Sequence, residues 1–282
     1  MTVLQAKDVL LQTLLPLYDQ REAEQMNHMV LEHITGMNRT DRAIHKHQQL
    51  TPDQIIKLES FTKKLAAGSP VQYVLGEAWF AGMRFSVNEH TLIPRPETEE
   101  LIEWIKAVAN PEPQSVLDIG TGSGCISVTL KKIFPLWKVQ AIDLSKGAIQ
   151  TAAENAKQHS VEIEYTVTDF LHEENWPAFS MFNLIVSNPP YIKISESASM
   201  AKHVVDHEPH AALFVPDDDA LIFYKKIAAF GKLHLKKNGL IFLEINQLLG
   251  HETSLIFEKA GYKTTIRKDL NGNDRMVMAQ WM

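Results

Sequence analysis

The sequence predicts an α/β fold, a doubly wound parallel sheet that follows a small helical bundle and a β-hairpin. From residue 114 onward, short apolar runs alternate with stretches of helical periodicity, which is typical of a parallel sheet covered on both faces. Before residue 70 the pattern is helical only, and a segment rich in aromatic and β-branched residues joins the two parts. We therefore expect a helical domain at 1–70, a β-hairpin linker at 71–95 and an α/β domain at 96–282.

The first domain is expected to form a bundle of helices at 2–18, 20–34, 38–48 and 51–68. The last of these has a clear start, with Thr51 as N-cap, Pro52 at the first helical position and Gln54 placed for a capping box. The hairpin is expected within 71–93, and Pro94 and Pro96 then lead into a helix at 97–109.

The second domain alternates strands with helices. Strands are expected at 115–120, 138–144, 161–167, 182–187 and 239–245. Helices are expected from residue 124 and at 145–158, 221–235 and 247–260, and a terminal strand pair at 262–270 and 275–282. Each βα unit packs a helix on one face of the sheet, so the strands run parallel.

Composition excludes several classes of protein. The 282 residues contain one cysteine, Cys125, so no internal disulfide forms, and no apolar run approaches the length needed to span a bilayer. Net charge is −6, from 28 Lys and Arg against 34 Asp and Glu, and residues 1–75 are neutral with 8 of each sign. Nucleic-acid binding usually needs a basic face, so a nucleic-acid partner is disfavoured. We expect a cytoplasmic protein with no membrane association.

Candidate functional residues follow four of the expected strands. The first strand runs into Gly120-Thr121-Gly122-Ser123-Gly124, the second ends at Asp143, the third precedes Asp169-Phe170, and the fourth precedes Asn188-Pro189-Pro190-Tyr191. In an open α/β sheet, ligands bind beyond the carboxyl ends of the strands. The sequence therefore predicts that all four segments border one site.

The glycine segment and Asp143 have the chemistry of a nucleoside site. Three alternate glycines permit a tight turn and close backbone approach to a ligand, and a carboxylate after the second strand can accept the two hydroxyls of a ribose. The spacing G-x-G-x-G is neither the dinucleotide fingerprint nor a P-loop. The alternatives are a βα turn without a ligand and, for Asp143, a helix N-cap.

The Asn188–Tyr191 tetrad has the chemistry of a pocket for a planar NH₂ group. Two prolines remove two backbone donors, so carbonyl oxygens remain as acceptors, and the Asn188 side chain adds another. The Tyr191 ring is expected to stack on the planar group. The alternative is an ordinary turn after a strand, in which Tyr191 only packs.

These motifs resemble the class I S-adenosylmethionine-dependent methyltransferases that act on planar nitrogens. More closely, the chain resembles the PrmC/HemK family, protein-(glutamine-N5) methyltransferases of class-1 peptide-chain release factors. The matching segments are LIPRPETEELIE (92–103), DIGTGSGC (118–125), SNPPYI (187–192), EPHAAL (208–213) and DLNGNDR (269–275). The resemblance implies a seven-stranded Rossmann-like sheet and an N-terminal helical domain that recognises the substrate.

The resemblance also implies the ligands and their residues. The cofactor would be S-adenosylmethionine, with S-adenosylhomocysteine as product, and the protein substrate would be the glutamine of the Gly-Gly-Gln motif of a release factor. The implied cofactor-binding residues are Gly120, Thr121, Gly122, Ser123, Gly124, Asp143, Phe170 and Asn188. The implied substrate-binding residues are Asn188, Pro189, Pro190 and Tyr191, of which Asn188 and Tyr191 are expected to be catalytic. Either Phe170 or Trp176 is expected beside the adenine.

Other readings of the sequence predict other features. A nucleic-acid amino methyltransferase acting on adenine N6 or guanine N2 predicts a basic groove, and a non-enzymatic adaptor predicts a damaged glycine loop or tetrad. Methyl transfer needs no metal, so His203, His207 and His210 are expected on a polar face rather than in a metal site. Arg95 either bridges the linker to the site or pairs with Glu99. We expect a monomer.

Overall fold

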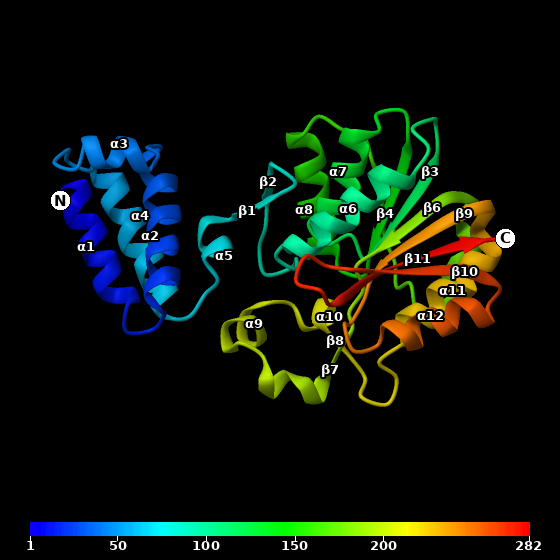
Figure 1. The fold of residues 1–282 in the computed structure, drawn as a ribbon. Helices are drawn as coiled ribbons and strands as arrows, with labels where there is room; N and C mark the ends of the chain where they lie inside the picture. Colours follow the sequence, from blue (N-terminus) through cyan, green and yellow to red (C-terminus); the bar gives the residue numbers. More distant parts are fainter. The chain divides into compact units, whose positions relative to one another are not determined.

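The computed structural model describes all residues from 1 to 282, and the chain forms two compact units. The smaller unit comprises Met1–Glu77 with Lys202–His207, and the larger one comprises Ala78–Ala201 with Glu208–Met282. The smaller unit is built of helices and the larger one of a sheet with helices (Figure 1). None of the helices is long and apolar enough to cross a membrane.

The smaller unit has one apolar core, to which four of its six helices contribute. Its helices are α1 (Val3–Leu14), α2 (Gln20–Thr35), α3 (Arg39–Ile44), α4 (Pro52–Ala66), α5 (Val71–Leu75) and α9 (Lys202–His207). The predicted start of α4 is confirmed, because the Thr51 hydroxyl accepts the Gln54 N–H and the Gln54 side chain accepts the Thr51 N–H. The core is formed by apolar residues of α1, α2, α4 and α5 at helical spacing.

Residues 71–75 form a helix and not the extended backbone expected from their composition. Helix α5 begins after Pro70 and ends at Gly76, which has the left-handed backbone (φ 73°) that favours glycine. Val71, Val74 and Leu75 lie on one side of this short helix and join the core of the smaller unit. Burial of these three side chains outweighs the strand preference of the two valines.

The hairpin is shorter than expected and consists of β1 (Glu77–Phe80) and β2 (Met83–Ser86). Phe80 and Phe85 are buried in the core of the larger unit. The buried Asn155 side chain accepts the Ser86 N–H and donates to the Ser86 carbonyl, so the end of the hairpin is tied to helix α8 (Lys146–Gln158).

The larger unit contains a seven-stranded sheet, as predicted, with strand order β10-β11-β9-β6-β3-β4-β5. The strands are β3 (Ser115–Ile119), β4 (Lys138–Asp143), β5 (Glu164–Val167), β6 (Phe182–Ser187), β9 (Leu235–Glu244), β10 (Tyr262–Lys268) and β11 (Asp274–Trp281). The first five strands run parallel, and β10 and β11 form the expected terminal antiparallel pair. The α/β fold class is confirmed.

Helices cover both faces of this sheet (Figure 1). The remaining helices of the unit are α6 (Pro96–Val108), α7 (Cys125–Ile133), α8, η1 (Glu173–Ala178), η2 (Ile194–Ser199), α10 (His210–Leu213), α11 (Ile222–His234) and α12 (Gly250–Lys259). Alternate residues of a strand point to opposite faces, so Val116 packs in the core under α6 and α7, and Leu117 packs in the core under α11 and α12.

Several boundaries differ from those expected. The third strand starts at Glu164 instead of residue 161, helix α12 starts at Gly250 instead of 247, and β9 starts at Leu235, inside the expected helix. A small parallel pair, β7 (Ile192–Lys193) and β8 (Phe214–Val215), was not expected, since two-residue strands leave no periodic pattern.

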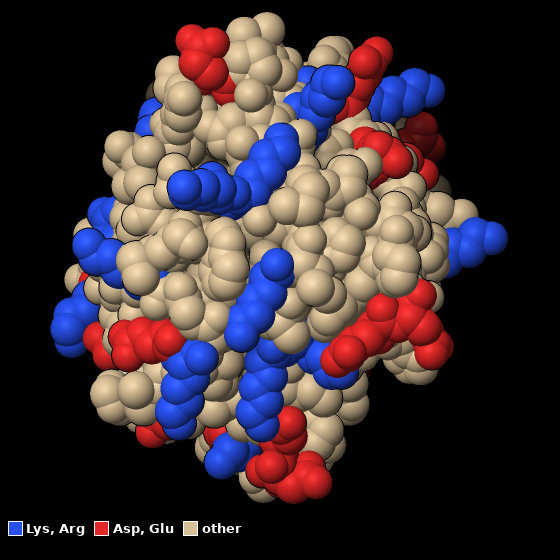
Figure 2. Space-filling model, turned by 90° about the vertical axis from the view of Figure 1, so that its right-hand side faces the viewer, with Lys and Arg blue, Asp and Glu red and all other residues tan.

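The edge strand β10 is protected by charge. Lys263, Arg267 and Lys268 on this strand are exposed, and cations on a sheet edge oppose pairing with another chain. Figure 2 views the molecule from the side where β10, β11 and α11 lie in Figure 1, and its blue and red side chains are interspersed with uncharged surface. This face presents no continuous basic groove.

Candidate active site

A cavity of about 320 Å³ lies at the carboxyl ends of β3, β4, β5 and β6 in the larger unit. All four segments singled out in the sequence contribute to its lining. The contributing residues are Gly120, Thr121, Gly122, Ser123, Asp143, Asp169, Phe170, Asn188, Pro189 and Pro190. Gly124 and Tyr191 are not among the lining residues. The structure thus brings ten of the twelve residues of these segments to one cavity.

The glycine loop follows β3 and depends on left-handed backbone. Gly120, Gly122 and Gly124 have φ angles of 74°, 55° and 78°, which L-residues with a side chain rarely adopt. A Cβ at Gly120 or Gly122 would have no heavy atom within 4 Å, whereas a Cβ at Gly124 would come within 3.0 Å of the Ala152 Cβ. Two of the glycines therefore keep the cavity open, and the third lets α7 pack against α8.

Thr121 and Ser123 turn their hydroxyls into the protein. The Thr121 hydroxyl donates to Oδ2 of Asp118 at 2.6 Å, and Ser123 is 2% exposed. These two residues can therefore offer a ligand their backbone groups. Burial raises the pKa of Asp118 to about 6, although the bonds from Thr121 and Ser127 favour its ionised form.

Asp143 links the second strand end to the glycine loop. Its Oδ2 accepts the Gly122 N–H at 2.9 Å, and its Oδ1 accepts the Ser145 N–H at 2.8 Å. The N-cap of α8 is Ser145, whose hydroxyl accepts the Ala148 N–H. Asp143 is thus not the cap of this helix, and burial raises its pKa.

Of the two aromatic candidates, Phe170 lines the cavity and Trp176 does not. Their rings stack with centroids 5.7 Å apart, and the Trp176 indole N–H donates to the Phe170 carbonyl at 2.9 Å. Trp176 therefore supports Phe170 from within the core.

The tetrad after β6 is held by contacts to distant parts of the chain. The Asn188 amide nitrogen Nδ2 donates to the Thr98 hydroxyl at 3.2 Å. The Tyr191 ring is half-buried, and its hydroxyl donates to Oε1 of Glu244 at 3.1 Å. Pro189 is buried and Pro190 partly buried. The structure thus presents Asn188 and the prolines to the cavity and turns the Tyr191 hydroxyl toward β9.

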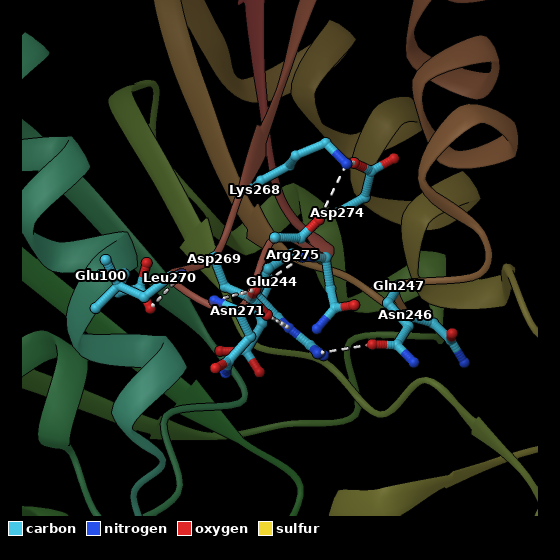
Figure 3. A network of polar contacts seen from close by, with 12 residues as sticks. Glu100, Glu244, Asn246, Gln247, Lys268, Asp269, Leu270, Asn271, Asp274 and Arg275 are labelled. Carbon is cyan, nitrogen blue, oxygen red and sulfur yellow. Dashed lines mark hydrogen bonds and ion pairs between the residues drawn. The ribbon is translucent and has the colours of Figure 1, made fainter.

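Glu244 accepts hydrogen bonds from two residues of the site, Thr98 and Tyr191, and lies beside Arg275 (Figure 3). Its Oε2 accepts the Thr98 hydroxyl at 2.6 Å, and the residue is 1% exposed. Burial raises the pKa of Glu244, and the bonds from Thr98 and Tyr191 and the charge of Arg275 oppose that rise. Burial and the Glu244 charge likewise raise the pKa of Tyr191.

Arg95 pairs with Glu208 and not with Glu99. Its guanidinium lies 2.6 Å from Oε1 of Glu208, whose side chain is 1% exposed, and Oε2 of Glu208 accepts the Ile93 N–H at 3.3 Å. Arg95 also lines the cavity, as do Pro209, Ala211 and Ala212 on the segment after Glu208. The pair joins the loop before α6 to the wall formed by that segment.

Sequence reasoning missed Thr98, Glu244 and the Arg95–Glu208 pair. Thr98 lies within LIPRPETEELIE without an assigned role. The one signal for Glu244 in the sequence is its place as an acidic residue at the end of the apolar strand GLIFLE.

The structure contains no group of three or more His, Cys, Asp or Glu side chains placed to hold a metal ion.

Comparison with known proteins shows to which protein family this chain belongs. Residues 98–213 match the model of the methyltransferase small domain, and residues 13–76 match that of the PrmC N-terminal domain. The chain is 42% identical over 271 residues to the release factor glutamine methyltransferase of Flavobacterium psychrophilum, with 94% of each chain covered. The chain belongs to the release factor glutamine methyltransferases.

A second member of the family, from Bacteroides thetaiotaomicron, is 36% identical, with 95% of this chain and 96% of that protein covered. Among solved structures, a methyltransferase from Pyrococcus furiosus has a TM-score of 0.53 at 15% identity, covering 82% of this chain and 98% of that one. The Thermus thermophilus 16S rRNA N2 G1207 methyltransferase has a TM-score of 0.54 at 17% identity, covering 73% and 50%. These two structures share the fold.

The family resemblance read from the sequence is thereby confirmed, and the chain is an enzyme, a methyltransferase. The alternative, a nucleic-acid amino methyltransferase, is not favoured, because the relatives that match nearly the whole chain are release factor glutamine methyltransferases.

Proposed function

We propose that this family member transfers a methyl group from S-adenosylmethionine to the side-chain amide nitrogen, N5, of the glutamine in the Gly-Gly-Gln motif of class-1 peptide-chain release factors. The observation that carries the proposal is the Asn188–Pro190 turn. It lines the same cavity as the glycine loop and Asp143, so acceptors suited to an NH₂ group lie beside residues suited to a nucleoside.

The residues around the glycine loop fit S-adenosylmethionine. The space at Gly120 and Gly122 is free of protein atoms, and each Asp143 oxygen has a second lone pair for a ribose hydroxyl besides the one used by a backbone N–H. Thr121, Ser123 and Gly124 complete the loop, and Phe170 supplies an apolar ring for the adenine. When bound, S-adenosylmethionine supplies a methyl group activated by a sulfonium, and no metal is required.

Asn188 and Pro189 orient the substrate amide. An amide nitrogen is a poor nucleophile because its lone pair is delocalised into the carbonyl. The Asn188 side-chain oxygen and the Pro189 carbonyl would accept its two hydrogens, direct the lone pair at the methyl group and stabilise positive charge developing on nitrogen. The methylated amide is strongly acidic while cationic, so it releases its proton without a dedicated base.

Pro190 completes the substrate pocket in this proposal, and Tyr191 supports it from the core. Pro190 lines the cavity and stiffens the turn, because its ring fixes one backbone dihedral angle and removes a donor. Tyr191 packs against the core below, and its hydroxyl is bonded to Glu244. We propose that Tyr191 affects catalysis through this contact, as a positioning residue, because it does not line the cavity.

The remaining assignments concern the whole molecule. We propose that residues 1–70 recognise the release factor, that 71–95 link the two parts, and that 96–282 carry the catalytic site. The enzyme would act as a monomer in the cytoplasm, where release factors work. The neutral charge of residues 1–75 suits a protein substrate better than a phosphate backbone.

Incubation with methyl-labelled S-adenosylmethionine tests the proposal. One arm contains a purified class-1 release factor, a second contains the same factor with the motif glutamine replaced by alanine, and a third contains ribosomal and transfer RNA. Label in the first arm alone is expected. Label in the RNA arm with none in the release factor would contradict it.

A further inference from the structure

We propose that Glu244 is a positioning residue that, through the Thr98 hydroxyl, determines which end of the Asn188 amide faces the substrate. The inference rests on the proposed role of Asn188. Glu244 ends strand β9, Thr98 lies in the first turn of α6, and Asn188 follows β6, so three distant segments meet in one chain of hydrogen bonds.

The ionised carboxylate of Glu244 determines which group donates and which accepts in each of these hydrogen bonds. An ionised carboxylate has no hydrogen to donate, so the Thr98 hydroxyl must donate its one hydrogen to Oε2 of Glu244, at 2.6 Å. Only lone pairs remain on the Thr98 oxygen, and its next partner must be a donor. That partner is Nδ2 of Asn188, at 3.2 Å.

The consequence is a fixed amide. The two ends of an asparagine amide have nearly the same size, so packing alone distinguishes them poorly. With Nδ2 held by Thr98, Oδ1 is the end left for the cavity, and Oδ1 is the atom needed to accept a hydrogen from the substrate NH₂ group. An inverted Asn188 would present a donor to a donor, and the substrate amide would not be oriented.

Burial raises the pKa of Glu244, and two of its neighbours oppose that rise by favouring the ionised form. Tyr191 donates to its other oxygen at 3.1 Å, and the charge of Arg275 stabilises the carboxylate. Arg275 is itself held by Oδ2 of Asp269, at 3.1 Å from Nε, and by the Gln247 side chain, at 3.3 Å (Figure 3). The segment DLNGNDR, which carried part of the family resemblance, thus has a physical role, since it places Arg275 beside Glu244.

The sharpest test removes the Thr98 hydroxyl without changing the shape of the side chain. In Thr98→Val the single-turnover rate at saturating S-adenosylmethionine and release factor is expected to fall at least tenfold, with the affinity for S-adenosylmethionine within twofold of wild type. Thr98→Ser retains the hydroxyl and is expected to recover most of the rate. Glu244→Gln is expected to lose rate like Thr98→Val, because an amide can donate to Thr98 and reverse the chain.

A matched control is Thr129→Val. Thr129 on α7 is also 2% exposed, but its hydroxyl has no hydrogen-bond partner and the residue does not line the cavity. The same buried substitution there is expected to leave the rate unchanged. Equal rates for Thr98→Val and Thr98→Ser would overturn the proposal, while activity of the wild-type enzyme on the release factor reports separately on the proposed function.

A second measurement does not depend on activity. The Asn188 side-chain NH₂ signal in a ¹⁵N–¹H NMR spectrum can be identified as the one missing from Asn188→Ala. This signal is expected to shift strongly in Thr98→Val and in Glu244→Gln, and to stay near its wild-type position in Thr98→Ser and Thr129→Val. An unchanged Asn188 signal in Thr98→Val would overturn the proposal even if the enzyme's substrate proved to be different.

Discussion

Substitution of Gly122 by alanine distinguishes a ligand-binding role of the glycine loop from a purely structural one. In Gly122→Ala the new methyl group meets no protein atom within 4 Å, and the backbone φ of +55° is the only source of strain. Left-handed backbone costs a non-glycine residue about 1–2 kcal/mol, so the free energy of unfolding should fall by that amount. The methyl group would also occupy cavity space assigned to S-adenosylmethionine. Forcing an extra methyl into a packed site costs about 1–3 kcal/mol, which weakens binding by about 5- to 150-fold.

The control is Gly36→Ala at the end of α2. Gly36 also has left-handed backbone (φ +69°), and a Cβ there would meet no heavy atom within 4 Å, but the residue lies in the smaller unit. Urea denaturation should show a similar loss of stability for the two variants. Isothermal titration calorimetry with S-adenosylmethionine should show weakened binding for Gly122→Ala alone. Equal affinity of the two variants would refute the assignment of this loop to the cofactor.

Three further predictions follow from the site. Asn188→Ala should lower methyl transfer to a release factor by about 100- to 1000-fold, the usual effect of removing one preorganised polar group, and calorimetry should show that binding of S-adenosylmethionine is much less affected. Asp118 has a folded-state pKa of about 6, above its ordinary value of 3.8, so its burial lowers stability increasingly as pH rises from about 4 to about 6. Urea denaturation of Asp118→Asn should lack this decline, which amounts to about 3 kcal/mol, and a parallel pH dependence in the two proteins would contradict the raised pKa. Arg95→Ala leaves the buried Glu208 carboxylate without its cation and should lower the free energy of unfolding by about 3 kcal/mol; this is the low end for a buried pair, because Arg95 is 32% exposed.

The parallel strands of the sheet could be predicted because their apolar runs are long and their burial is two-sided. The runs at 115–120, 138–144, 182–187 and 239–245 correspond to β3, β4, β6 and part of β9. Helix α5 could not be predicted in this way. Five residues are too few to show a helical period, and their helical state depends on the core they join.

The cavity could be predicted in outline for a similar reason. Strand ends in a parallel sheet meet at one edge, so the residues that follow β3, β4, β5 and β6 were expected together. The hydrogen bonds between them were not, because their partners are far apart in the sequence. Thr98 and Glu244 are separated by 146 positions, and only the folded sheet brings α6 and the end of β9 into contact. The position of Tyr191 could not be predicted for the same reason. Its hydroxyl faces Glu244, which is distant in the sequence, and the residue does not line the cavity.

Mass spectrometry of a class-1 release factor after reaction tests the central claim most directly. The enzyme and S-adenosylmethionine are incubated with the release factor, and its peptides are sequenced by fragmentation. One added methyl group on the side-chain amide of the Gly-Gly-Gln glutamine is predicted, and none with Asn188→Ala. An unmodified glutamine in the presence of cofactor-bound enzyme, or a methyl group on another residue, would contradict the proposed function.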